Sequence, residues 1–269
     1  MIQALKIKKT LSKFKNVNIW KTLYFNFKVL PFSQAFRLPF FLYGKVVLMD
    51  LGGKIITPNT VKMGMIRIGY RWLDLWPVSF LPTQIQVKGE LIFHGPAILS
   101  GGTVLNVQNK NGIIEIGSEV CIGGGTMVKC MDRITIGDRS SITGNCCIMD
   151  CNMHFIKDIE SGRIAKFKSP IIIGKNCWIN YGTVISKGAV VPDYTITSRN
   201  TLVSKDFSDI GTNRMLVGTP AKVVGSKVQR IFSIELQHKF ARFFNENNED
   251  FYQSEPGIEN EIGPKEGFN

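Results

Sequence analysis

The stretch Ile116-Gly117-Ser118-Glu119-Val120-Cys121, continued by Ile122-Gly123-Gly124-Gly125-Thr126-Met127 and Val128, places an aliphatic residue at every sixth position. Outward from it, the same spacing passes through Ile136, Ile142 and Ile148 to His154, resumes at Ile173, Ile179, Ile185 and Val191, slips to Thr197 and returns at Val203. A helix repeats its apolar residues every three or four positions, and an alternating strand every two. A period of six fits neither, so we predict an all-β solenoid.

In such a solenoid each hexad supplies one short strand and one tight turn, with the aliphatic residue directed into the axis. One unit cannot bury its apolar face alone, whereas stacked units can. Gly117, Gly137 and Gly174 each follow an inward aliphatic residue by one position. We expect them to supply the permissive φ angles of the turns.

Three segments near the end of the repeat are the most specific: Pro170-Ile-Ile-Ile-Gly-Lys-Asn-Cys-Trp-Ile179, Val203-Ser-Lys-Asp206 and Val217-Gly-Thr-Pro-Ala-Lys-Val-Val224. In this order they resemble the last coils and exit segment of the left-handed β-helix acyltransferases with hexapeptide repeats. Within that family they are similar to the maltose, galactoside and capsule O-acetyltransferase branch. The resemblance covers roughly residues 85 to 225 and implies a left-handed parallel β-helix.

The chain divides into three predicted parts. Residues 1–84 form a basic, aromatic N-terminal extension, helical over 1–28, with irregular first coils from residue 50. Residues 85–225 form the left-handed β-helix acyltransferase domain, interrupted by the loop 155–169. Residues 226–269 form a helix, from the three-and-four spacing of Val228 to Phe243, and a solvated acidic tail.

The charge is unevenly distributed, although the total is +12. Nine Lys or Arg and no Asp or Glu precede Asp50, a balance that favours contact with an anionic surface. Phe32, Phe36, Phe40 and Phe41 lie in this basic region, where prolines and charges interrupt any membrane span. Two interpretations stay open: these aromatic residues cap the first coil, or they lie on the inner membrane surface. We predict no nucleic-acid partner.

The six cysteines mostly occupy small-residue positions of the repeat, which is typical of reduced thiols rather than of a disulfide framework. Adjacent Cys146 and Cys147 lack the spacing of metal ligands, so we predict no metal. No cleavable signal peptide is visible. We therefore expect a cytoplasmic protein, or one peripheral on the inner membrane face.

His154 is the candidate general base, because it stands where the repeat breaks into the loop and imidazole titrates near neutral pH. The resemblance implies that a histidine at this exit point is catalytic; a buried structural histidine is the alternative. Asp150 is predicted to hold the other ring nitrogen, or else to cap a turn. His94 and His238 are expected at the surface.

The resemblance also assigns the ligand-binding positions. Trp178 matches a wall of the acceptor pocket, with packing against the loop as the alternative. The predicted acetyl-CoA contacts are Asn180, Tyr181, Arg199, Ser204, Lys205 and Lys222. Two departures weaken the match: Asn180 stands where the family usually has Gly, and the hexad Ile122–Gly125 lacks the asparagine that often stabilises the oxyanion.

Together these residues predict an acetyl-CoA-dependent O-acetyltransferase that acts on a hydroxyl of a sugar or surface-polysaccharide precursor. Acetyl-CoA is the co-substrate. The family groove lies between protomers, so a homotrimer is implied. Two alternatives are N-acylation of an amino-sugar nucleotide and a non-catalytic β-helical scaffold that binds its partners.

Overall fold

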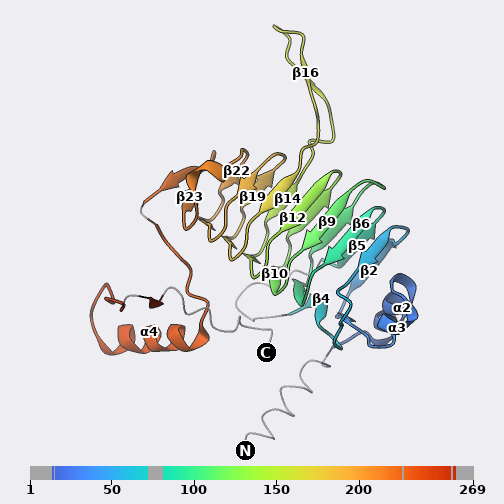
Figure 1. Cartoon of the computed structure of the whole chain (residues 1–269), viewed down its shortest axis with the longest axis horizontal. Helices are drawn as coiled ribbons and strands as arrows, with labels where there is room; N and C mark the ends of the chain where they lie inside the picture. The colour runs from blue at the N-terminus through green and yellow to red at the C-terminus, as the bar shows by residue number, and fades with distance from the viewer. Residues whose placement is uncertain (1–13, 15, 72–80, 226, 256, 259–269) are drawn as a thin grey trace, which may run out of the picture.

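The computed structural model describes residues 14, 16–71, 81–225, 227–255 and 257–258 (Figure 1). The first half of the predicted basic helix, residues 1–13, and the end of the predicted acidic tail, residues 259–269, lie outside this range.

Three sheets wind around one axis in the part of the chain that the structure describes, and their strands are parallel except where β23 pairs with β24. The nine-stranded sheet contains, in spatial order, β1 (Phe40–Leu42), β4 (Ile66–Tyr70), β7 (Ala97–Ser100), β10 (Val120–Ile122), β13 (Ser141–Ile142), β18 (Trp178–Ile179), β21 (Ile196–Thr197), β23 (Met215–Val217) and β24 (Lys222–Val224). The seven-stranded sheet contains β2 (Val46–Asp50), β5 (Thr83–Val87), β8 (Val104–Val107), β11 (Met127–Cys130), β14 (Cys147–Met149), β19 (Val184–Ser186) and β22 (Leu202–Val203). The six-stranded sheet contains β3 (Lys54–Ile56), β6 (Glu90–Phe93), β9 (Ile113–Ile116), β12 (Arg133–Ile136), β17 (Ile171–Ile173) and β20 (Val190–Val191).

The repeated aliphatic residues stack in register along the axis. Ile122 pairs with Ile142, and Ile148 pairs with Val128 on one side and Ile185 on the other. All five side chains are almost completely buried in one continuous core. The predicted parallel β-helix is therefore confirmed, and burial of stacked aliphatic columns is its main source of stability.

Thr197, where the aliphatic spacing slips, still occupies an inward position and is fully buried. Its hydroxyl accepts a hydrogen bond from the backbone N–H of Asn180 at 2.8 Å and lies 3.0 Å from the Thr183 hydroxyl. The polar residue is tolerated in the core because its oxygen is paired.

Gly117, Gly137 and Gly174 serve a different purpose from the predicted one. None of them has a positive φ angle; that conformation falls two residues later, at Glu119, Arg139 and Asn176. A Cβ atom on Gly137 would lie 2.6 Å from the carbonyl carbon of Gly174 in the next coil. These glycines are required by close stacking of the corners and not by permissive backbone angles.

The solenoid begins earlier than the predicted regular start near Ile85. Strand β1 pairs in parallel with β4, β2 with β5 and β3 with β6, so the first coil starts at Phe40. The sequence pattern misses this coil because Phe40 to Tyr43 are buried at every position, which hides any period.

Helix α2 (Ile19–Val29) and the short helix α3 (Phe32–Ala35) lie at the N-terminal end of the solenoid (Figure 1). The Asn26 side chain donates to the Phe40 carbonyl at 2.9 Å and accepts from the Phe40 N–H at 3.1 Å. Thr22 Oγ1 accepts from the N–H of Leu42 at 3.0 Å. Two side chains of the helix thus form hydrogen bonds with the backbone groups at the free edge of β1. Without them this edge could pair with a strand of another molecule.

The cap predicted from the four phenylalanines is correct for only two of them. Phe40 and Phe41 are buried, and the Phe25 ring packs edge-on against Phe40 with centroids 5.1 Å apart. Phe32 and Phe36 remain exposed, because helix α2 covers the first coil and leaves α3 on its outer side.

Replacing Asn26 by Ala is expected to lower the free energy of unfolding by about 2 kcal/mol, since it leaves a buried N–H and a buried carbonyl at β1 without partners. Urea denaturation of the purified chain measures this. Asn59→Ala, at an exposed position without a positive φ angle, is the control. Equal stability of the two variants would show that Asn26 does not hold the helix on the sheet.

The C-terminal helix starts later than predicted. Helix α4 spans Ile234–Glu246, and Ser233 caps it by accepting from the Leu236 N–H at 3.3 Å. The preceding residues from Lys227 have no regular secondary structure, and the Val228 N–H donates to the Asn213 carbonyl at 2.9 Å. The apolar residues before Ser233 follow helical spacing by coincidence, because they meet the solenoid as an irregular segment. The 3-10 helix η1 (Ser208–Ile210) and the antiparallel strand β24 close the last coil.

Candidate functional site

The predicted loop 155–169 is an antiparallel hairpin that projects from the middle of the solenoid (Figure 1). Its strands are β15 (Ile156–Lys157) and β16 (Ile164–Ala165). Below them the Asn152 N–H donates to the Phe167 carbonyl at 2.8 Å, and the Ser169 N–H donates to the Asp150 carbonyl at 2.9 Å. The hairpin therefore has a paired neck where it leaves the coil.

His154 lies just above this neck with an exposed side chain. The preceding Met153 has a φ of 63°, an uncommon angle for a residue other than Gly or Asn. Among the described residues no side chain or backbone group is hydrogen-bonded to the imidazole. The alternative of a buried structural histidine is therefore wrong, and the ring is accessible to substrate.

Asp150 does not act on His154 as predicted. Its side chain is completely buried, and its carboxylate accepts from the backbone N–H groups of Met131 at 2.8 Å and Asp132 at 2.7 Å. The Cys130 thiol also donates to it at 3.3 Å. Asp138 and Asp193 make equivalent bonds to Ser118 N–H and Lys175 N–H in the coil before them. Asp150 belongs to this series of turn-capping carboxylates, so the structural alternative describes it.

Ser204 and Lys205 lie on the same corner of the solenoid as His154. We call it the loop corner: the edge where the chain passes from the seven-stranded to the six-stranded sheet, at residues 130–132, 150–170, 187–189 and 204–206. Lys205 is two coils beyond His154, or about 10 Å along the axis at the usual strand spacing. Both Ser204 and Lys205 are exposed, and Lys205 Nζ lies 4.9 Å from the centroid of the Phe207 ring.

Asn180, Tyr181 and Arg199 lie on a different edge. We call it the asparagine corner: the passage from the nine-stranded to the seven-stranded sheet, at residues 123–126, 143–146, 180–183 and 198–201. The Tyr181 hydroxyl is hydrogen-bonded to Asn145 Nδ2 of the preceding coil. Asn180 Oδ1 accepts from the Tyr181 N–H at 2.8 Å. Within one chain these residues do not meet His154.

Trp178 and Lys222 belong to the nine-stranded sheet. The Arg230 guanidinium lies 4.9 Å from the Trp178 ring centroid, so the C-terminal segment partly covers the indole. Trp178 therefore packs against Arg230 of the C-terminal segment and not against the hairpin. Lys222 is exposed on β24, at the C-terminal end of the same sheet.

The outer face of the seven-stranded sheet separates the two corners. Its outward side chains include a column of mostly apolar residues, one on each of the last five strands of the sheet: Val104, Met127, Cys147, Val184 and Leu202. All are partly or fully accessible in the single chain. Each corner carries a part of the predicted site, and this apolar column lies between them.

Five of the six cysteines are poor candidates for a nucleophile. Burial raises the pKa of the Cys146 thiol to about 11 and that of Cys177 to about 12, and it raises the pKa of Cys130, Cys147 and Cys151 as well. These thiols are neutral at pH 7 and poor nucleophiles. The described residues contain no group of three His, Cys, Asp or Glu placed to hold a metal ion.

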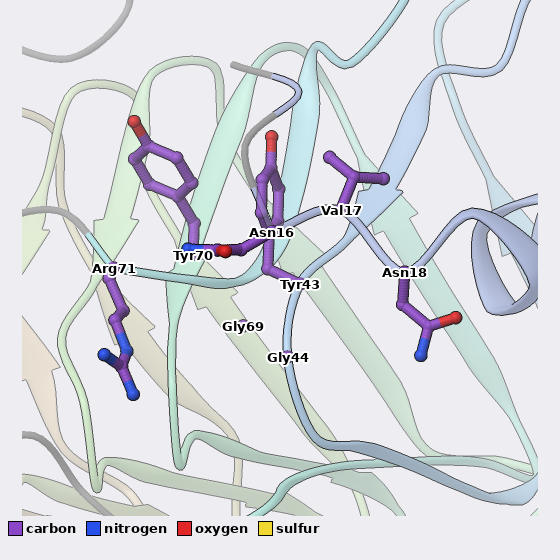
Figure 2. A pocket seen from close by; sticks show the side chains of 8 residues that line it. All are labelled: Asn16, Val17, Asn18, Tyr43, Gly44, Gly69, Tyr70 and Arg71. Atoms are coloured by element: carbon purple, nitrogen blue, oxygen red, sulfur yellow. The ribbon is translucent and has the colours of Figure 1, made fainter. Parts of the chain in front are cut away.

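A cavity of about 660 Å³ opens at the N-terminal end and contains none of the predicted site residues. Figure 2 shows Tyr43, Tyr70 and Arg71 among its lining residues. The rings of Tyr43 and Tyr70 pack edge-on with their centroids 4.9 Å apart. Burial raises the pKa of Tyr43. The sequence pattern did not identify this cavity, because its walls come from segments outside the regular repeat.

Comparison with known proteins gives a match in structure only. No protein-family model matches the sequence, and no curated protein matches it significantly. The polySia-specific acetyltransferase NeuO is similar, with a TM-score of 0.53 and 18% identity over 75% of this chain and 94% of NeuO. Two weaker matches are AntD, an N-acyltransferase from Bacillus cereus crystallised with dTDP and 3-hydroxybutyryl-CoA (TM-score 0.44, 13% identity, 77% of this chain and 88% of that chain), and the polysialic acid O-acetyltransferase OatWY (TM-score 0.38, 15% identity, 75% and 97%).

The likeness to NeuO is one of fold, and it confirms the predicted left-handed parallel β-helix. The predicted maltose, galactoside and capsule branch stays a prediction.

Proposed function

We propose that this β-helix is an acetyl-CoA-dependent O-acetyltransferase that transfers an acetyl group to a hydroxyl of a sugar or surface-polysaccharide precursor. One observation carries the proposal: an accessible histidine, His154, stands at the neck of a projecting hairpin on the same corner as Ser204 and Lys205. The proposed base and the proposed phosphate-binding lysine thus lie along one edge of a fold shared with an acetyltransferase.

The proposed reaction is direct transfer. His154 takes the proton of the acceptor hydroxyl as its oxygen attacks the acetyl carbonyl of acetyl-CoA. The tetrahedral intermediate then collapses, the C–S bond breaks, and the imidazolium returns the proton to the departing thiolate. The products are an acetyl ester and free CoA. No acyl-enzyme is needed, which agrees with the neutral buried thiols.

The site is completed by a neighbouring protomer in this proposal, and we propose a homotrimer. One chain places His154 and Lys205 on the loop corner but Asn180, Tyr181 and Arg199 on the asparagine corner. Packing the apolar column of the seven-stranded sheet against a second copy would bring the loop corner of one chain next to the asparagine corner of the other. Trp178 could join an acceptor pocket only in such an assembly.

The Lys205→Ala variant is expected to weaken CoA binding about tenfold, because one charge-assisted contact to a phosphate is worth about 1.4 kcal/mol. Isothermal titration calorimetry of the full chain with CoA measures this. Lys62→Ala, which removes an exposed lysine at the far end of the solenoid, is the matched control. Absence of CoA binding by the unmodified chain would favour the scaffold alternative.

Product analysis separates the O-acetyl reaction from N-acylation. An ester is cleaved by mild alkali, whereas an amide survives it. The fold and His154 are compatible with both, and the acceptor that the chain modifies decides between them. We place the reaction in the cytoplasm, with a peripheral contact at the inner membrane face.

A further inference from the structure

Five aromatic side chains of the N-terminal helices remain in solvent after the solenoid has been capped. We call Trp20, Tyr24, Phe27, Phe32 and Phe36 the aromatic patch. Trp20 is 82% exposed, Phe32 74% and Phe36 72%. The ring centroids of Phe27 and Phe32 are 5.9 Å apart, and those of Phe32 and Phe36 6.2 Å apart, so these three rings are contiguous. Contiguous exposed apolar surface of this kind marks an interaction site.

The patch is separate from the capping function of helix α2. Trp20, Tyr24 and Phe27 are spaced by four and three residues, which places them in one stripe along the helix. The buried residues Thr22, Phe25 and Asn26 lie on the opposite side, against β1. Packing within the chain therefore explains the inner side of the helix and leaves the aromatic stripe without a role.

The charges around the patch are mostly basic, although Asp50 lines the same small pocket as Tyr24 and Lys28. From Ile19 to Met49 the chain carries Lys21, Lys28, Arg37 and Lys45 and no Asp or Glu. Lys28, Arg37 and Lys45 are exposed, whereas Lys21 Nζ donates to the Val46 carbonyl at 2.5 Å. Exposed aromatic rings flanked by basic side chains are the features of a helix that lies in the headgroup region of an anionic bilayer.

We propose that the aromatic patch binds the surface of an anionic lipid membrane. Trp20 and Tyr24 place amphipathic rings at the headgroup level, Phe27, Phe32 and Phe36 enter the boundary of the acyl chains, and the basic residues meet the lipid phosphates. None of the described helices is long and apolar enough to cross a membrane, so the contact is peripheral. This proposal does not depend on the acetyl transfer reaction.

The test is flotation of the full chain with vesicles of phosphatidylcholine alone or mixed with phosphatidylglycerol. The unmodified chain is expected to float with the anionic vesicles, less so at high salt. Trp20→Ser/Phe32→Ser is expected to lower the partition coefficient about tenfold, because it removes the two most exposed rings of the patch.

The matched control is Leu81→Ser/Phe251→Ser, which removes two side chains that are 69% and 87% exposed elsewhere on the molecule. It is expected to float like the unmodified chain, and thermal unfolding checks that both variants are folded. A second variant, Lys28→Gln/Arg37→Gln, is expected to remove the preference for phosphatidylglycerol.

Failure of the unmodified chain to float, or equal flotation of the two serine variants, would overturn the proposal. Self-association that Trp20→Ser/Phe32→Ser abolishes, without vesicle binding, would assign the patch to a second copy instead. Acetyl transfer to a water-soluble acceptor is expected to be unchanged in all three variants, so a failed reaction and a failed membrane contact are distinguishable.

Discussion

The His154→Ala variant is expected to transfer acetyl groups about 10²- to 10⁴-fold more slowly than the unmodified chain, the usual effect of losing a general base. The acceptor hydroxyl would then have to lose its proton to water in the transition state. Release of CoA, followed with a thiol reagent in the presence of the acceptor, measures the rate. The loss should appear in kcat, because the imidazole acts on the reacting proton and not on the binding of CoA.

The substitution is not expected to disturb the fold. His154 is exposed, and no hydrogen bond joins its ring to the described residues, so the thermal midpoint should stay within about 1 °C. His94→Ala is the control, since His94 is also exposed and contacts Glu115 at 3.2 Å. Undiminished turnover in His154→Ala would overturn the proposed reaction, and an equal loss in both variants would point to a nonspecific effect.

The Asp150→Ala variant is expected to lower the free energy of unfolding by about 3 kcal/mol. The substitution leaves the partly buried N–H groups of Met131 and Asp132 without their acceptor and removes charge-assisted hydrogen bonds. Asp150→Asn should recover only part of the loss, since an amide keeps one acceptor oxygen where the carboxylate used two. Urea denaturation measures both values.

Asp132→Ala is the matched control, because this neighbouring carboxylate is a third exposed and its contact with Lys168 is long, at 3.5 Å. Asp132→Ala should lower the free energy of unfolding by less than about 0.5 kcal/mol. Activity per folded Asp150→Asn molecule separates the two roles of Asp150. If Asp150 only caps the turn, the kcat of folded Asp150→Asn molecules is unchanged at low temperature. A lower kcat of the folded molecules would support the predicted contact between Asp150 and His154.

Much of the fold could be predicted because a solenoid repeats one local rule. Each hexad buries one aliphatic residue, so the columns of Ile122, Ile142 and Ile148 follow from spacing alone. The position of His154 at the break in this spacing, and its surface exposure, likewise follow from a local interruption of the repeat.

The tertiary structure decided what depends on neighbours in other coils. Asp150 caps a turn because the corner of the preceding coil presents two N–H groups to it. Phe32 and Phe36 are exposed because helix α2 occupies the end of the solenoid first. Trp178 and Asn180 are separated from His154 because Trp178 lies in the nine-stranded sheet and Asn180 at the asparagine corner, whereas His154 lies at the loop corner. Local spacing sets which residues point inward, but only the stacking of distant coils determines which outward residues share an edge.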